Sequence, residues 1–401
     1  MGTLLKFEIK KIVMKKSTIV AFVLLFGIQV FLSMTGSLGS TYKNDMFVET
    51  HAERNRIDRE HGIALSGRAI DDVLLSEMQE AYAGFDWNNP DYWWTDEYNQ
   101  GVRRYTDLEY RLKLWGMGTG YPFDNMEAEV LYDLRRNQRD SMWEAYELSD
   151  KEKTYWQEKD AEVEIPFVYE YASGYDFLTG MQGMYMTCML MTFFIGISMV
   201  TVFAEEHTRK TDQLILCARY GKSKAYFAKI LAGSLVVFGG NMLFAGVLIV
   251  GRFFCFGTEG FGAAIQSVVA PWYSYPLTMG QALLLMTGIL LLSGVLVAVC
   301  AMLLAEVLGN SVGAMAVVVG LLFAARLVPI PPSFGVLSQA WNYMPINMLK
   351  VDEGFLDPRL VNLFGLQLTT WQFAPILYVV LIGGMVFAGS RFYRRYQVSG
   401  R

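Results

Sequence analysis

Residues 281–305 read QALLLMTGILLLSGVLVAVCAMLLA, a run of 25 residues without a lysine, arginine, aspartate or glutamate. The hydrocarbon core of a bilayer is about 30 Å thick, and about 20 helical residues cross it. This stretch is therefore long enough and apolar enough to span a membrane. Charge-free windows of similar kind recur along the 401-residue chain, at 17–42, 177–204, 230–251, 260–305, 307–325 and 360–390. Their repetition indicates a polytopic membrane protein.

The charges that remain are distributed very unevenly. The chain is 53% hydrophobic and 18% charged, with a formal net charge of −5. Residues 40–180 hold 15 basic and 30 acidic side chains, whereas the rest of the chain holds 19 basic and 9 acidic ones. An acidic, water-soluble block of about 140 residues, long enough for its own core, is therefore inserted into a basic membrane protein. No disulfide framework is expected in this block, because the cysteines lie elsewhere, at Cys188, Cys217, Cys255 and Cys300.

The N-terminal sequence indicates how the first span is oriented. Five lysines precede it: Lys6, Lys10, Lys11, Lys15 and Lys16. Positively charged residues stay on the cytoplasmic side, so the first span, about 17–34, runs outward and the acidic block faces the outside. A cleaved signal peptide is the alternative, but signal h-regions are shorter, at about 7–15 residues.

Five further spans are predicted at about 181–203, 230–251, 281–305, 307–325 and 373–390. The uncharged residues 260–305 could hold two spans, but Pro271 and Pro276 interrupt their first half. Two spans there would also place the C-terminal arginines outside, against the charge rule. We therefore expect one span, preceded by an outer interfacial or re-entrant segment.

The predicted fold is an all-α membrane protein with six transmembrane helices and both termini in the cytoplasm. Residues 1–38 form an amphipathic N-terminal helix and the first span. Residues 39–178 form a mainly helical extracellular domain between the first two spans, and residues 179–401 hold the other five spans.

The predicted outer domain carries helical signals. Apolar residues recur every three or four positions within 70–85 and 102–115, and no sustained period-two pattern is present. Asn125 can cap a third helix. Ser149 followed by Glu152 fits a capping box, in which each residue satisfies a backbone N–H at the start of a helix.

The same domain contains a concentrated group of aromatic residues: Trp87, Tyr92, Trp93, Trp94 and Tyr98. Such rings can form a surface that holds a lipid tail, a sugar face or an apolar peptide. The alternative is that they pack helices together or rest on the outer leaflet.

The chain shows no recognisable means of hydrolysing a nucleotide. The sequence 221–223, Gly-Lys-Ser, is like the end of a phosphate-binding loop, but that loop needs glycine where Leu216 stands. No His-Glu-x-x-His or Gly-x-Ser-x-Gly motif occurs either. A membrane-embedded enzyme would therefore lack an evident metal cluster or nucleophile.

Ionisable residues are almost absent from the predicted span centres. Glu306 is expected in the turn between the fourth and fifth spans, and Arg326 at the outer end of the fifth. Because intramembrane charges mark ion pathways, a carrier driven by protons or sodium would lack its usual residues. The energy for transport is then expected from another subunit.

Residues 203–229 read FAEEHTRKTDQLILCARYGKSKAYFAK. This stretch resembles the cytoplasmic segment of type-2, exporter-type ABC transporter permeases. In that family an acidic residue ends the second span, and a Thr-x-x-Leu-Leu-like segment, a basic turn and a lysine follow. The matching residues are Glu205 or Glu206, Thr211, Leu214, Ile215, Lys222 and Lys229. The family often has proline in the turn, where this chain has Tyr220 and Gly221. Residues 4–16 also resemble the amphipathic N-terminal helix of the family.

The resemblance implies that an ABC ATP-binding subunit docks on residues 211–216 and 219–224. The residues expected at this joint are Glu205, Glu206, Arg209, Thr211, Asp212, Leu214, Ile215, Arg219 and Lys222. The resemblance further implies that the partner subunit binds ATP and Mg, and that this chain binds no cofactor. It also implies that a second copy of the permease, or a paralogue, completes the transporter. Membrane lipids are expected to contact the chain, and nucleic acid is not. The protein is expected in a bacterial plasma membrane.

The predicted function is that of an exporter permease that moves a lipid, an antimicrobial peptide or a hydrophobic drug. The alternative is an envelope-stress or peptide sensor, or a resistance module, whose outer domain binds a peptide or a cell-wall precursor.

Overall fold

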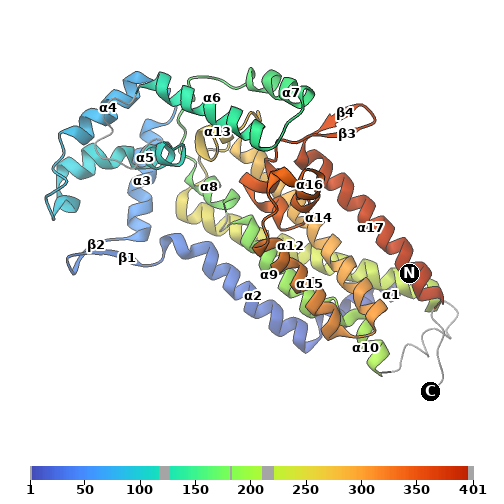
Figure 1. The fold of residues 1–401 in the computed structure, drawn as a ribbon. Helices are drawn as coiled ribbons and strands as arrows, with labels where there is room; N and C mark the ends of the chain where they lie inside the picture. The colour runs from blue at the N-terminus through green and yellow to red at the C-terminus, as the bar shows by residue number, and fades with distance from the viewer. Residues whose placement is uncertain (1, 117–126, 181–182, 210–220, 396–401) are drawn as a thin grey trace.

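The computed structural model describes residues 2–116, 127–180, 183–209 and 221–395. Helices account for 73% of it and strands for very little, which confirms the mainly helical fold class. Figure 1 shows a bundle of long helices with a second helical body at one end. We call this second body, residues 39–178, the insert.

The bundle is built mainly from long apolar helices, together with the short polar helix α10. They are α2 (Lys16–Met34), α9 (Met184–Ser198), α10 (Thr201–Arg209), α12 (Tyr226–Phe256), α14 (Met279–Leu308), α15 (Ser311–Leu327) and α17 (Thr370–Arg395), with α1 (Gly2–Val13) beside them. Within the described residues, five apolar helical segments are long enough to cross a membrane, and α9 and α10 together form one of them. Five predicted spans are thus confirmed as long apolar helices.

The fifth predicted span, 307–325, corresponds to the shorter helix α15. This helix has 17 residues, fewer than the about 20 that cross a bilayer. The predicted start was wrong, because residues 307 and 308 complete α14 and the chain turns at Gly309, whose φ is +60°. The Asn310 side chain then caps α15 by accepting from the Val312 N–H at 2.9 Å. Glu306 accordingly lies in the last turn of α14 and not in the connecting turn.

Helix α14 lies at the centre of the bundle, where it packs against α9, α12, α15 and α17. It is one continuous helix of 30 residues, so the uncharged residues 260–305 contribute to a single long apolar helix and not to two. Its approach to α12 depends on Gly294, because a Cβ there would overlap the Asn241 amide. Asn241 donates to the Leu290 carbonyl at 3.2 Å and so keeps its Nδ2 satisfied between the two helices.

The insert is mainly helical, as predicted. Its α-helices are α3 (His51–Leu65), α4 (Asp72–Ala83), α5 (Thr106–Leu114), α6 (Ala128–Ala145), α7 (Asp150–Asp160) and α8 (Ser173–Thr179). Shorter turns are η2 (Tyr92–Trp94), η3 (Glu97–Val102) and η4 (Arg103–Tyr105). Helices α4 and α5 fall inside the predicted windows, and their apolar faces enclose a buried core with Ile70, Leu74 and Leu108.

The helix starts in the insert test two predictions. Ser149 and Glu152 form the predicted capping box at α7. Helix α6 instead begins after Glu127, which provides no side-chain cap, so Asn125 is not the residue adjoining this helix. Asn125 itself lies outside the described residues.

A short hairpin, β1 (Ser40–Lys43) with β2 (Met46–Thr50), was not predicted. Its turn places Asn44 and Asp45 at positive φ, +48° and +62°, a conformation that asparagine and aspartate tolerate in two-residue hairpin turns. The strands are too short for a period-two pattern to reveal them.

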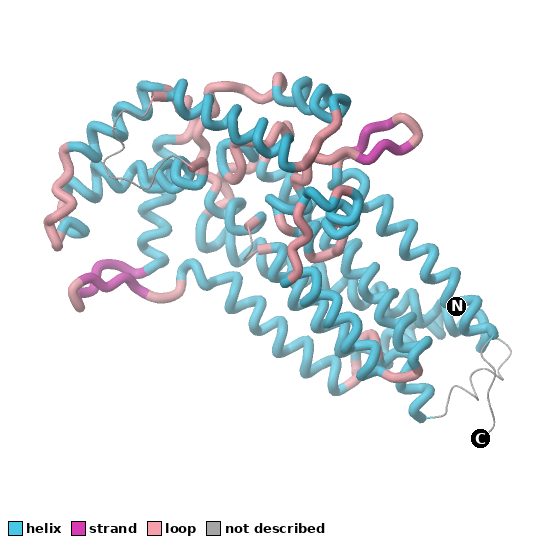
Figure 2. The backbone as a smooth tube through the Cα atoms, viewed as in Figure 1, coloured by secondary structure: helices cyan, strands magenta, loops and turns pink. Residues whose placement is uncertain are grey.

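The remaining segments connect the long helices. They are η1 (Thr35–Ser37), η5 (Gly221–Ala225), α13 (Ile265–Val268), η6 (Pro332–Phe334), α16 (Val336–Asn342), η7 (Asn347–Leu349), η8 (Val351–Phe355), and the hairpin β3 (Val361–Leu363) with β4 (Leu366–Leu368). Figure 2 shows many loops between the bundle and the insert.

Candidate coupling site at the α10 end of the bundle

The predicted ATPase-docking segment begins where α10 ends. Helix α10 follows α9 after a break at Met199 and Val200. Figure 1 places α1 and α10 near one another, at the end of the bundle that is away from the insert. The polar side chains at this end define the candidate site.

Glu206 lies between two lysines from different helices. Its Oε1 accepts from Lys11 Nζ of α1 at 2.7 Å, and it is also paired with Lys229 Nζ of α12. The side chain of Glu206 is 7% exposed and that of Lys229 is 0% exposed. Charges removed from water this completely are tolerated when they are paired. The Lys11–Glu206–Lys229 triad therefore ties α1, α10 and α12 together.

The neighbouring Glu205 makes a second connection to the N-terminal region. Its Oε2 lies 2.7 Å from Lys15 Nζ, at the junction of α1 and α2, and both side chains are partly exposed. An ion pair in such a position stabilises by about 0.2–1 kcal/mol. Glu205 consequently helps to orient α1, but the buried triad is the stronger constraint.

The structure thus places Glu205 and Glu206 in ion pairs within the chain. Arg209 is the last residue of α10 and Lys222 belongs to η5, but their side chains lie outside what the structure describes. The other predicted docking residues also lie outside it: Thr211, Asp212, Leu214, Ile215 and Arg219. Docking of an ATPase on this segment stays a prediction.

Sequence reasoning missed the lysine partners of Glu205 and Glu206. Lys11 lies in α1, but Lys15 follows the end of this helix and is the N-cap residue of α2, so the four-residue spacing of the two lysines did not place them on one helix face. The identity of their partners was not available from the sequence, because Lys11 and Glu206 are 195 residues apart.

The predicted aromatic surface of the insert is brought together, but its rings face one another. The Tyr92 ring centroid lies 4.6 Å from that of Trp93, 5.1 Å from that of Tyr98 and 5.8 Å from that of Trp87. Trp94 is 40% exposed, whereas the other four rings are partly buried. This geometry favours the packing alternative, and ligand binding at these rings stays a prediction.

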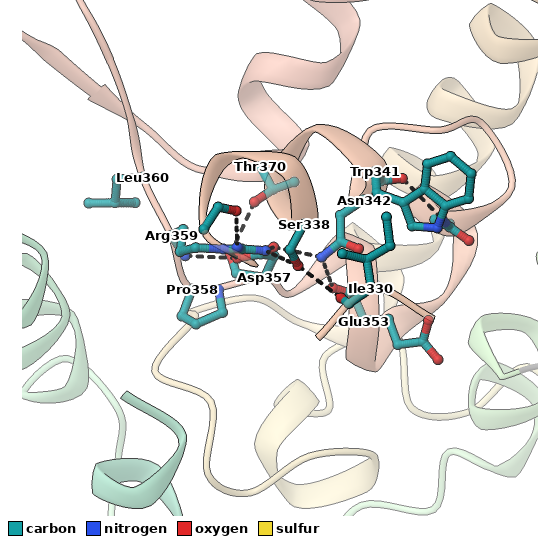
Figure 3. A network of polar contacts seen from close by, with 12 residues as sticks. Ile330, Ser338, Trp341, Asn342, Glu353, Asp357, Pro358, Arg359, Leu360 and Thr370 are labelled. Atoms are coloured by element: carbon teal, nitrogen blue, oxygen red, sulfur yellow. Dashed lines mark hydrogen bonds and ion pairs between the residues drawn. The ribbon is translucent and has the colours of Figure 1, made fainter. Parts of the chain in front are cut away.

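At the opposite end of the bundle, a buried carboxylate organises the segment that joins α15 to α17. Asp357 accepts from Arg359 Nε at 3.0 Å and from Asn342 Nδ2 at 2.8 Å. Its backbone carbonyl accepts from Thr370 Oγ1 at 3.0 Å. Figure 3 shows Asp357 and Arg359 side by side, with Ser338 of α16 and Thr370 of α17 around them.

Two hydrogen bonds connect the insert to this segment. Trp156 Nε1 of α7 donates to the Pro358 carbonyl at 2.5 Å. The Glu152 carboxylate accepts from the Leu360 N–H at 2.8 Å. Helix α7 of the insert is therefore connected to the chain that leads into α17.

A second set of hydrogen bonds connects the insert to the segment before α14. Arg135 of α6 donates to the Pro271 carbonyl at 2.8 Å, and Ser274 donates to Asp160 of α7 at 2.7 Å. Burial raises the pKa of Asp160, but hydrogen bonds from Arg135 and Ser274 and the charge of Arg139 outweigh it, so this pKa lies below its usual value. Asp160 is thus ionised at neutral pH and holds both arginines.

A bundle with five helical segments long and apolar enough to cross a membrane, within the described residues, defines a multi-pass membrane protein. The chain matches the family model described as ABC-2 family transporter protein over residues 3–376, and it therefore belongs to that family. It is a membrane permease of an ABC transporter, and the family implies partnership with an ATP-binding subunit. No curated protein and no solved structure matches the chain.

Proposed function

We propose that this permease exports an amphipathic substrate across a bacterial plasma membrane, while a separate subunit binds and hydrolyses ATP with Mg²⁺. Membership of the ABC-2 family supports the transport role and the ATP-binding partner. The observation that supports the coupling mechanism is the Lys11–Glu206–Lys229 triad, in which Glu206 and Lys229 are buried, since it connects the helix before the predicted docking segment to α1 and α12.

The proposed topology has six membrane helices, with α15 as the fifth. Seventeen residues of α-helix measure about 26 Å, and α15 packs against α9 and α14 within the bundle. The lysines of α1 and the last turns of α17, which contain Arg391 and Arg394, lie at the α10 end, which the charge rule assigns to the cytoplasm. The acidic insert is then extracellular, and both termini are cytoplasmic.

Coupling would begin on residues 211–216 and 219–224, where the ATP-binding subunit is proposed to dock. A displacement there reaches α10 directly, because this helix ends at Arg209. The triad transmits this displacement to α1 and α12. Glu206 of α10 cannot move away from Lys229 of α12 without leaving that lysine buried and unpaired. Two six-helix halves would form the transporter, as a homodimer or with a paralogue.

An apolar cavity supports an amphipathic substrate. It has a volume of about 400 Å³ and lies among α1, α2, α9 and α12, with Phe22, Phe194 and Leu243 in its lining. Its walls are almost wholly apolar, so it suits the hydrocarbon part of a lipid, a peptide or a drug.

The docking proposal is tested by co-purification of the tagged permease with its ATP-binding subunit. The double variant Leu214→Ala/Ile215→Ala is expected to lose the ATPase and still fold, because it shortens side chains at the proposed joint. The matched control is Val336→Ala/Leu337→Ala, which shortens exposed apolar residues of α16 at the other end of the bundle. An ATPase that remains bound to the first variant contradicts docking on this segment.

The alternative role is a sensor or resistance module in which the insert binds a peptide or a cell-wall precursor. The hydrogen bonds from the insert to the Pro271 and Pro358 carbonyls support a mechanical connection between the insert and the bundle. Tight peptide binding by the purified protein, with little transport in proteoliposomes, would support the sensor role over the exporter.

A further inference from the structure

We propose a binding site for the phosphate headgroup of a membrane phospholipid at the insert end of α9 and α15. An acyl chain of the same lipid would lie in an apolar groove that runs from this point between α15 and α17. The inference rests on the proposed placement of α15 in the membrane. It extends that proposal, because it concerns a lipid site of this chain and not the ATPase joint.

Two cations face the same tyrosine ring at this position. The Arg326 guanidinium, in the last turn of α15, lies 5.7 Å from the centroid of Tyr185, and Lys350 Nζ lies 5.9 Å from it. Lys350 is paired with Glu353, whose side chain is largely exposed. Within the part of the chain that the structure describes, no carboxylate lies within ion-pair distance of Arg326. Among the described residues, the site therefore holds one positive charge, that of Arg326, without a carboxylate partner.

The hydroxyl of Tyr185 is also without a partner among the described residues. Tyr185 is 2% exposed, and its Oη makes no hydrogen bond there. Buried hydroxyls are nearly always hydrogen-bonded, so such an atom calls for an explanation. A phosphate oxygen would accept from it, while the other phosphate oxygens would meet Arg326 and the Lys350 ammonium. Charge-assisted contacts of this kind are the strong ones.

An apolar groove begins one to two helical turns from these cations. It has a volume of about 240 Å³ and is lined by Leu322 of α15, Leu381 of α17 and Thr192 of α9, with further apolar residues. Leu322 precedes Arg326 by one turn. Thr192 follows Tyr185 by seven residues, which is about 10 Å along α9.

The groove is open on its side, since Leu321 and Leu381 are both more than two-fifths exposed. In the proposed topology this side faces the hydrocarbon of the membrane. A phospholipid matches the whole arrangement, because its phosphate and its acyl chain are joined at a similar spacing. Free phosphate would satisfy only the cations, and an apolar compound would satisfy only the groove.

The test measures lipid binding to the purified full-length chain by native mass spectrometry. The probes are phosphatidylglycerol, a diacylglycerol with the same acyl chains, and inorganic phosphate. We expect phosphatidylglycerol to bind about tenfold more tightly than the diacylglycerol, as for one charge-assisted hydrogen bond or more. Inorganic phosphate at millimolar concentration should leave it bound.

Variants separate the two halves of the site. Arg326→Gln should weaken phosphatidylglycerol about tenfold and remove the preference over the diacylglycerol. Leu321→Trp should fill the groove and weaken both lipids alike. Arg391→Gln is the matched control, because Arg391 also lies over an aromatic ring, that of Phe387, but near the C-terminal end of α17 and far from the proposed site along that helix. This variant should change the binding of neither lipid.

Equal binding of the two lipids to the native chain would overturn the proposal, as would unchanged binding by Arg326→Gln. Displacement of the lipid by inorganic phosphate would show an anion site only. If Arg326→Gln does not fold, the comparison of the two lipids on the native chain and on Leu321→Trp still decides. The ATP-binding subunit is absent from this experiment, so its outcome is separate from that of the docking test.

Discussion

At the scale of single residues, the bundle is shaped by a few buried charges near its helix ends. Glu206 and Lys229 are paired at one end, and Asp357 and Arg359 at the other. Each pair also meets a third element, Lys11 of α1 in the first case and α16 in the second. A buried pair adds little net stability, but removal of one partner leaves an uncompensated charge.

Glu206→Gln should therefore destabilise the permease far more than Glu205→Gln. The first change leaves Lys229 buried without a counter-ion and should cost about 3–5 kcal/mol. The second removes a partly exposed pair and should cost less than about 1 kcal/mol. Thermal unfolding of the detergent-purified variants measures the difference. Equal losses would show that the triad is not the stronger constraint on α1.

Asp357→Asn should destabilise the segment between α15 and α17. The new amide would present a donor to Asn342 and would leave Arg359 without its carboxylate, at a cost of about 3 kcal/mol or more. Asp352→Asn is the control, because Asp352 is exposed in the same segment and such changes usually stay within about 0.5 kcal/mol. Limited proteolysis of this segment, compared with the native chain, reports the effect; identical cleavage of the two variants would contradict it.

At the scale of elements, helices α6, α7 and α8 determine how the insert meets the bundle. Helices α6 and α7 reach the segments before α14 and α17, and α8 packs directly against α12 and α14. Helix α8 carries Asp176, whose neighbours include Arg111 and Asp107. Burial, opposed by the charge of Arg111 and reinforced by that of Asp107, raises the pKa of Asp176 to about 6.

This raised pKa predicts a pH-dependent junction. The folded protein holds the Asp176 proton more tightly than the unfolded chain, whose aspartates titrate near about 3.9. The contribution of Asp176 to stability is therefore fully present below about pH 4 and is lost as the pH rises through about 6.

Asp176→Asn should remove this loss, so its stability advantage over the native protein should grow between about pH 4.5 and pH 7. Melting temperatures across that range measure the effect, with the exposed Asp91→Asn as the control. An advantage that is constant with pH would show that Asp176 does not titrate there.

At the scale of the whole molecule, the insert and the α10 end lie at opposite ends of the bundle. If the bundle crosses the membrane, the two ends must face different compartments. Continuous helices satisfy this arrangement because their backbone polar groups are bonded within each segment.

Membrane-impermeant thiol labelling of intact cells should therefore modify Glu97→Cys in the insert and not Lys10→Cys in α1. Both positions are exposed, so access to the compartment decides the result. Permeabilised cells should show labelling at both positions. Labelling of Lys10→Cys in intact cells, without Glu97→Cys, would reverse the proposed orientation.

The sequence was sufficient for properties that depend on neighbouring residues. It predicted six spans, five of which are long apolar helices, and it predicted the capping box at Ser149, because hydrophobic length and helix capping are local. It misplaced the start of α15 and the cap of α6, and it missed the β1–β2 hairpin, because short elements carry weak patterns. It also identified the family through residues 203–229, which the match over 3–376 supports.

The sequence by itself determined that this chain is a membrane protein with a charged segment between its first two long apolar helices, because water and hydrocarbon select residues by composition. Only the tertiary structure decided which charges are partners. Glu206 is 195 residues from Lys11, and Trp156 is 202 residues from Pro358. Such contacts depend on how whole helices pack, and helix packing is set by the shapes of many side chains at once. The same packing brought Arg326, Lys350 and Tyr185 together above an apolar groove, which no local pattern in the sequence indicated.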